Sequence, residues 1–97
     1  MVLTVLETNV PVGREGELEA AYHEGATGSL PAGFIRSELL RDARDQTRWR
    51  IQTWWLSADA LDAMRRAGTP RGVLMFRAAG VEPVLSVFDV VDALPHH

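Results

Sequence analysis

The fold of this chain is decided by Arg48-Trp49-Arg50-Ile51-Gln52-Thr53-Trp54-Trp55-Leu56, a stretch that contains all three tryptophans and leads into a helix start at Ser57. Successive side chains of a β-strand point to opposite faces. One face therefore carries Trp49, Ile51, Thr53 and Trp55, and the other carries Arg48, Arg50, Gln52, Trp54 and Leu56. Such a strand needs two different covers. We predict a central strand with helices on one side and a wetter cover, such as a second subunit, on the other.

The length and charge of the chain limit the classes of function. Its 97 residues suffice for one domain with a core, so we expect a single domain over 1–97 with 92–97 as a flexible tail. A net charge of -3 gives no electrostatic reason to expect nucleic acid or an anionic membrane as a partner. The N-terminal apolar run meets a charge at Glu7, too early for a signal peptide or a membrane span, and we expect a cytoplasmic protein.

Residue types that are missing exclude several chemistries. The chain has no cysteine, and all ten of its cationic side chains are arginines. Disulfides, thiol catalysis and lysine Schiff bases are therefore excluded. Of the three histidines, His96 and His97 end the chain and are either native or part of a purification tag. A single internal histidine does not make a metal site, so we expect no metal and no cofactor.

Periodicity and turn residues divide the chain into seven elements. We predict strands over 2–8, 34–41, 48–56 and 84–91, and helices over 14–26, from Ser57 to Gly68, and from Thr69 as N-cap to Gly80. The order β-α-β-β-α-α-β is typical of an α+β, ferredoxin-like fold, with a four-stranded antiparallel sheet and helices on one face.

The second face of that sheet has no helix to cover it. Matching Glu38 with Arg50 by charge puts Leu39 opposite Trp49 and Ile35 opposite Thr53. On that basis the open face carries Phe34, Arg36, Glu38, Arg50, Gln52 and Trp54. Exposed aromatic rings are costly in water. We therefore expect a homodimer through this face, with Phe34, Arg36, Arg50 and Trp54 as its contacts.

Four short motifs, in their order and spacing, resemble one known family. They are Gly13-Arg14-Glu15, Gly33-Phe34, Leu40-Arg41-Asp42, and Trp54-Trp55-Leu56-Ser57-Ala58-Asp59-Ala60-Leu61. Together they resemble the antibiotic biosynthesis monooxygenase (ABM) family of dimeric α+β barrels over roughly residues 3–91. Some members oxygenate polycyclic aromatic molecules without metal or flavin, some degrade haem, and many have no established activity. The resemblance implies a cofactor-independent monooxygenase for a small hydrophobic aromatic or quinol-type molecule.

The family's functional residues are only partly present. Trp55 matches the tryptophan of the aromatic-oxygenating members, which work with an asparagine four residues earlier and a tyrosine six residues later. Those positions are Ile51 and Leu61 in this chain. The asparagine of the haem-degrading members falls near Leu6, and no histidine occurs between Trp55 and the tail. Haem binding is therefore less supported than a non-catalytic ligand-binding or structural dimer, which is the main alternative.

The candidate site combines residues from four predicted elements. The catalytic candidates are Trp55, His23 and Tyr22, and the candidates for substrate binding are Trp55, Ile51, Leu61, Leu74, Met75, Phe76 and Arg77. Each also has a purely structural interpretation. Trp55 and the apolar residues can be ordinary core, and His23 and Arg77 can be surface residues.

Overall fold

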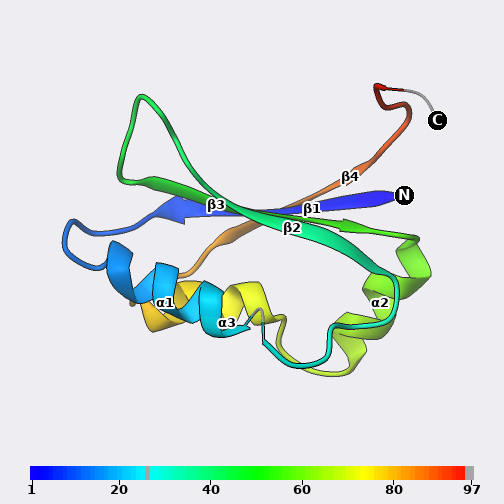
Figure 1. The fold of residues 1–97 in the computed structure, drawn as a ribbon, viewed down its shortest axis with the longest axis horizontal. Helices are drawn as coiled ribbons and strands as arrows, with labels where there is room; N and C mark the ends of the chain where they lie inside the picture. Colours follow the sequence, from blue (N-terminus) through cyan, green and yellow to red (C-terminus); the bar gives the residue numbers. More distant parts are fainter. Residues whose placement is uncertain (26, 96–97) are drawn as a thin grey trace.

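The structure, a computed structural model, describes residues 1–25 and 27–95. Its seven elements are β1 (Val2–Asn9), α1 (Glu15–Gly25), β2 (Phe34–Arg41), β3 (Arg48–Trp55), α2 (Ala58–Arg66), α3 (Arg71–Ala78) and β4 (Val84–Asp89). The strands form one antiparallel sheet in the order β2-β3-β1-β4. All three helices lie on the same face of it (Figure 1). The predicted ferredoxin-like α+β fold is confirmed.

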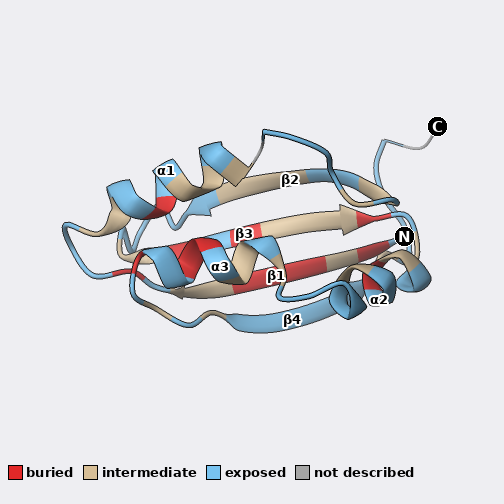
Figure 2. Cartoon of the chain, turned by 90° about the horizontal axis from the view of Figure 1, so that it is seen from below, coloured by how far each residue is buried: buried red, intermediate tan, exposed pale blue. Residues whose placement is uncertain are grey.

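The strand that carries the three tryptophans is central, as predicted, because β3 lies between β1 and β2. Its apolar face meets the helices, and Trp49, Ile51 and Trp55 are each 4% exposed. The buried residues run along β1 and β3, with further buried residues on each of the three helices (Figure 2). Leu18 of α1 and Phe76 of α3 are fully buried against this face. Packing of the helices onto β3 therefore forms the core.

The predicted pairing of β2 with β3 is wrong by two residues. Glu38 lies opposite Gln52, not Arg50, and Leu39 lies opposite Ile51. Charge complementarity misled the prediction, because Arg50 forms its ion pair with Glu7 of β1, the strand on the other side of β3. A shift of two residues keeps every side chain on its original face, so the assignment of faces survives from Arg36 onward, where the pairing is regular.

Phe34 is a second correction, because it does not lie on the open face. A bulge between Phe34 and Arg36 inserts Ile35 and breaks the alternation of β2. The ring of Phe34 turns to the helix side and meets Trp55 edge-on, with ring centroids 5.9 Å apart. Arg36 stays on the open face, where its guanidinium lies 4.3 Å above the ring of Trp54.

The open face is strongly polar at the hairpin end. Glu7 binds two arginines, with its carboxylate oxygens 2.6 Å from Arg48 Nη2 and 2.6 Å from Arg50 Nη2. The hydrogen bonds from Arg48, and then those from Arg50, hold the pKa of Glu7 below its usual value. Arg50 and Trp54 thus lie on this face, as predicted. The three helices leave the face uncovered (Figure 1).

The helix ends agree with the sequence in one case and differ in another. Ser57 is the N-cap of α2, and its hydroxyl accepts a hydrogen bond from Ala60 N at 3.2 Å. The N-cap of α3 is Pro70, not Thr69, because the Pro70 carbonyl already accepts from Val73 N and Leu74 N. Residue 26 of the predicted first helix and residues 96–97 of the predicted tail lie outside the described residues. In the described part of the chain, no helix is long and apolar enough to span a bilayer.

Candidate functional site

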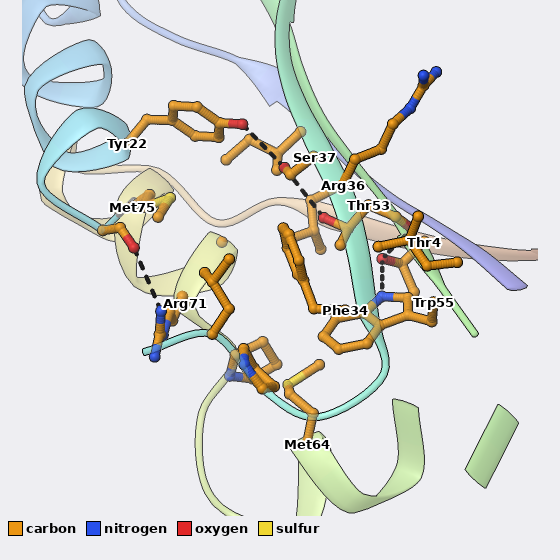
Figure 3. Close-up of a pocket in the computed structure, with 18 residues that line it drawn as sticks. Thr4, Tyr22, Phe34, Arg36, Ser37, Thr53, Trp55, Met64, Arg71 and Met75 are labelled. Atoms are coloured by element: carbon orange, nitrogen blue, oxygen red, sulfur yellow. Dashed lines mark hydrogen bonds between the residues drawn. The ribbon is translucent and has the colours of Figure 1, made fainter. Parts of the chain in front are cut away.

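A cavity of about 410 Å³ lies between the sheet and the helices. Its floor is the helix side of β1 and β3, with Leu6, Ile51, Thr53 and Trp55 (Figure 3). Phe34 closes one side by its edge-on contact with Trp55. The volume falls within the range of about 300–1,000 Å³ typical of small-molecule sites. The floor is thus the apolar face on which the sequence places Trp55.

The absence of a side chain at Gly72 helps to keep this space open. Tyr22 of α1, Met75 of α3 and Met64 of α2 line the helix side of the cavity. Gly72 of α3 lies close to the sheet, because a Cβ on it would lie 2.6 Å from Leu6 Cδ1. A larger residue at Gly72 would therefore push α3 away from the sheet or fill the cavity. Methionine side chains adapt to irregular ligands, so this wall can accommodate rings of different shapes.

Three hydroxyl groups from three elements meet at the cavity wall. Tyr22 Oη donates to Ser37 Oγ at 3.1 Å, and Thr53 Oγ1 donates to Ser37 Oγ at 3.3 Å (Figure 3). All three residues line the cavity. We call Tyr22, Ser37 and Thr53 the hydroxyl cluster. It gives an otherwise apolar chamber one polar region.

The indole of Trp55 is held in a fixed orientation. Its Nε1–H donates to Thr4 Oγ1 at 3.1 Å, and Thr4 Oγ1 donates in turn to the Thr53 carbonyl at 3.4 Å. Thr4 is itself buried, at 8% exposure. Because the N–H already has a partner in the protein, Trp55 presents its ring to the cavity and leaves polar recognition to other groups.

Arginine is the charged residue at this cavity. Arg71, at the start of α3, donates to the Gly25 carbonyl at 3.4 Å and to the Ser29 carbonyl at 2.5 Å. It ties the segment after α1 to α3. Arg36 also contributes to the lining, but its guanidinium points away and stacks on Trp54 (Figure 3). None of the described lining residues is an aspartate, glutamate or histidine.

The structure brings four of the predicted site residues together. Tyr22, Ile51, Trp55 and Met75 all line the cavity. Leu61 is instead buried in a cluster with Val2 and Trp55, outside the cavity lining.

The other predicted residues lie elsewhere. Phe76 is fully buried in the main core, and Leu74 is 51% exposed on the outer side of α3. Arg77 forms an ion pair with Glu82 on the surface. His23 is exposed on α1 and outside the cavity lining. Their proposed roles in binding or catalysis have no support from their positions.

Sequence reasoning missed several lining residues. Thr53 shares a face with Trp55 by simple alternation, and that signal could have identified it. Ser37 faces the helices by the same alternation. Phe34 could not be placed, because the bulge reverses its face. Thr4 could be found only from the pairing of β1 with β3, which sets Thr4 opposite Thr53.

The described residues do not form a preorganised ligand set for a metal ion. Within residues 1–25 and 27–95, no group of three or more histidine, aspartate and glutamate side chains is arranged to hold a metal ion. The chain has no cysteine to add to such a set. The cavity itself offers hydroxyls, aromatic rings and thioethers.

Comparisons with known proteins identify the family. A family model for antibiotic biosynthesis monooxygenases matches residues 1–69. Two solved structures are SnoaB, a cofactor-independent oxygenase from Streptomyces nogalater, and the haem-degrading MhuD from Mycobacterium tuberculosis. SnoaB is 22% identical, with 98% of this chain and 97% of that chain covered and a TM-score of 0.71. MhuD is 25% identical, with 97% and 99% covered and a TM-score of 0.73.

A third solved structure, a candidate antibiotic biosynthesis monooxygenase from Deinococcus radiodurans, is 12% identical. It has a TM-score of 0.75 over 100% of this chain and 99% of that chain. No curated protein matches the sequence. The family model covers more than half of the chain, and the solved structures share its fold over almost their whole length. The chain therefore belongs to the antibiotic biosynthesis monooxygenase family.

Proposed function

We propose that this protein is a cofactor-independent monooxygenase for a small aromatic or quinol-type molecule bound in the 410 Å³ cavity. The observation that carries the proposal is the lining, which combines aromatic and thioether walls with one hydroxyl cluster. A flat, hydrophobic ring that bears oxygen fits such a chamber. The similarity in fold between this chain and SnoaB, a cofactor-independent oxygenase, supports the same function.

The reaction draws its electrons from the substrate. The phenol loses its O–H proton, and the phenolate, which has carbanion character at the para carbon, transfers electrons to O₂ and forms a C–O bond at that carbon. The peroxide then takes up a proton, the same carbon loses its one hydrogen as a proton, and the O–O bond breaks to give a carbonyl and water. One C–H, one O–H and one O₂ thus give two C=O groups and one H₂O, and no external reductant is needed.

The protein contributes solvent exclusion and electrostatics. The cavity removes water from the bound carbanion, while hydroxyl donors stabilise the oxygen on which its charge develops. Arg71 adds a positive charge at the wall, which favours the ionised form of a bound phenol or enol. Because the described lining holds no carboxylate or imidazole, we propose that the ionisation is assisted by the substrate itself. His23, outside the cavity, has no part in it.

Oxygen uptake with a reduced three-ring phenol tests the proposal. We expect uptake above the buffer rate and a loss of about tenfold in Trp55→Phe, which corresponds to roughly 1.4 kcal/mol of transition-state stabilisation. Trp54→Phe is the matched control, because it makes the same change on the opposite face. Circular dichroism checks that both variants fold. Uptake at the buffer rate, or an equal loss in both variants, would contradict the proposal.

A non-catalytic ligand-binding protein is the second candidate. One observation favours it. The aromatic-oxygenating members of the family have hydrogen-bonding side chains at the positions that Ile51 and Leu61 occupy in this chain. Leu61 is moreover buried in a cluster with Val2 and Trp55 and is not among the lining residues of the cavity. Quenching of tryptophan fluorescence by the same phenol, without oxygen uptake, would favour this candidate over the enzyme.

Haem is not part of the proposal, because the donor set does not fit it. The MhuD structure holds two haems in its active site. Protein haem irons are bound by histidine, cysteine or tyrosine, or by methionine beside a histidine. The described lining offers no histidine, the chain has no cysteine, and the Tyr22 hydroxyl is bonded to Ser37. Met64 and Met75 alone are weak ligands.

We further propose that the protein forms a homodimer through the open face of its sheet. Phe88, on the same face as Trp54, is 52% exposed. A second copy would cover these two aromatic rings. Apolar patches of this kind commonly mark interfaces.

A further inference from the structure

The hydroxyl cluster has a spare proton. Tyr22, Ser37 and Thr53 carry three hydroxyl protons, and the two hydrogen bonds that join them use two. The count holds whichever way each hydroxyl is turned. No other hydrogen bond of these three side chains within the described chain takes up the third proton. The cluster therefore has one hydroxyl donor left for something else.

The surroundings determine what that donor can bind. The described lining contains no carboxylate or imidazole that could accept the proton. The nearby Thr4 hydroxyl is already engaged by Trp55 and by the Thr53 carbonyl. The walls beside this donor are largely apolar, and a hydrogen bond made in apolar surroundings is stronger than one in water. An acceptor oxygen on a ligand would therefore bind favourably to this donor.

We propose that Tyr22, Ser37 and Thr53 form an oxygen-binding subsite that selects hydroxylated or keto-substituted aromatic rings over the corresponding hydrocarbons. The subsite deepens the proposed function and rests on it for the identification of the cavity as the substrate site. Ser37 lies on β2 and Tyr22 on α1, whereas Ile51 and Leu61, the positions where the oxygenating members of the family have polar residues, lie on β3 and α2. The subsite thus supplies polar recognition from other residues of the same chamber.

Removing all three hydroxyls together is the sharpest test. The triple variant Tyr22→Phe, Ser37→Ala, Thr53→Val keeps the shapes and leaves no partner unpaired, so little stability is lost. Binding of 2-naphthol and of naphthalene is measured by titration, and the ratio of their two dissociation constants is compared between proteins. We expect the preference for 2-naphthol to fall by about fivefold to tenfold in the triple variant. Ser86→Ala, a loss of one hydroxyl on the opposite face, should leave the ratio unchanged.

A second measurement needs no variant. Bound 1,4-naphthoquinone, which only accepts hydrogen bonds, should show a carbonyl stretch at lower frequency with the wild-type protein than in an apolar solvent. An unchanged ratio in the triple variant, or an unshifted carbonyl stretch, would overturn the subsite. Oxygen uptake separates it from the proposed function. If the preference for 2-naphthol depends on the three hydroxyls but no oxygen is taken up, the subsite stands and the oxygenase is refuted. If oxygen is taken up but the preference does not depend on the hydroxyls, the oxygenase stands and the subsite is refuted.

Discussion

At the scale of single residues, the tryptophan that defines the candidate site depends on one threonine. Trp55 is 4% exposed, and its indole N–H has Thr4 Oγ1 as its partner at 3.1 Å. Alternation along the strand was enough to place Trp55 on the helix side. Thr4 was not predicted, because a single sequence shows the face of a residue but not which residue of another strand lies opposite it.

Thr4→Val should destabilise the protein without changing the shape of its core. The substitution leaves the buried Trp55 N–H without an acceptor, and a lost partner of this kind costs about 1–3 kcal/mol. Urea unfolding followed by circular dichroism measures the loss. Thr4→Ser keeps the hydroxyl and should retain most of the stability. A Thr4→Val protein as stable as the wild type would show that the indole finds another acceptor.

At the scale of elements, the entry to β2 is the feature that sequence reasoning could not supply. The bulge at Ile35 turns Phe34 toward Trp55, and it follows Gly33, which has φ of +80°. A Cβ on Gly33 would lie 2.4 Å from Ala60 Cβ, so α2 packs directly over this turn. Alternation predicts the residues of a regular strand, but an inserted residue is visible only when the pairing partner is known.

Gly33→Ala should therefore be much more harmful than the same change at Gly28. Both glycines have positive φ, but a Cβ on Gly28 would have no atom within 4 Å. Gly28→Ala carries only the backbone penalty, about 1 kcal/mol. Gly33→Ala adds the clash with Ala60 and should lose about 1–3 kcal/mol more. Chemical denaturation of the two variants measures the difference, and equal losses would mean that α2 moves aside at little cost.

The pairing of β1 with β3 is expected to weaken in acid. The pKa of Glu7 is lowered when folded, by hydrogen bonds from Arg48 and Arg50. Its stabilisation is therefore fully present above the unfolded value of 4.5 and is lost as the pH falls through the lower folded value. Glu7→Gln should be less stable than the wild type by about 0.5–1 kcal/mol at pH 7, since these side chains are partly exposed.

Stability measured at several pH values checks this expectation. The gap between wild type and Glu7→Gln should close below pH 4.5, while Glu7→Asp, which keeps the charge on a shorter side chain, should preserve part of the pH dependence. Glu17, Asp42 and Asp45 also have lowered pKa values and titrate in the wild type and variant alike, so the difference isolates Glu7. A gap that is constant with pH would mean that the ion pairs contribute nothing.

At the scale of the whole molecule, one face of the sheet forms the cavity with the helices and the other face is open. The sequence predicts the arrangement of the elements better than it predicts the lining of the cavity. Turn residues and periodicity in the chain sufficed for the element order, the central strand and the helix-covered face. The cavity depended on details that a pattern does not contain, such as the room left by Gly72 and the meeting of Tyr22 with Ser37. Leu61 and Phe76 look like lining residues in the sequence, but packing buries them behind the chamber.

The open face leads to the last prediction, that Trp54→Glu dissociates the proposed dimer. Trp54 is half-buried under Arg36 within one chain, and a carboxylate there would replace an aromatic contact by a charge next to Glu38. Aromatic residues at the centre of an interface usually dominate its affinity, so we expect the dimer dissociation constant to rise at least about tenfold. Sedimentation velocity over a range of concentrations measures it. Leu74→Glu makes an equivalent change at an exposed site on the helix side and should leave the dimer intact. A wild-type protein that sediments as a monomer at every concentration, or a Leu74→Glu variant that dissociates equally, would show that a second copy does not cover this face.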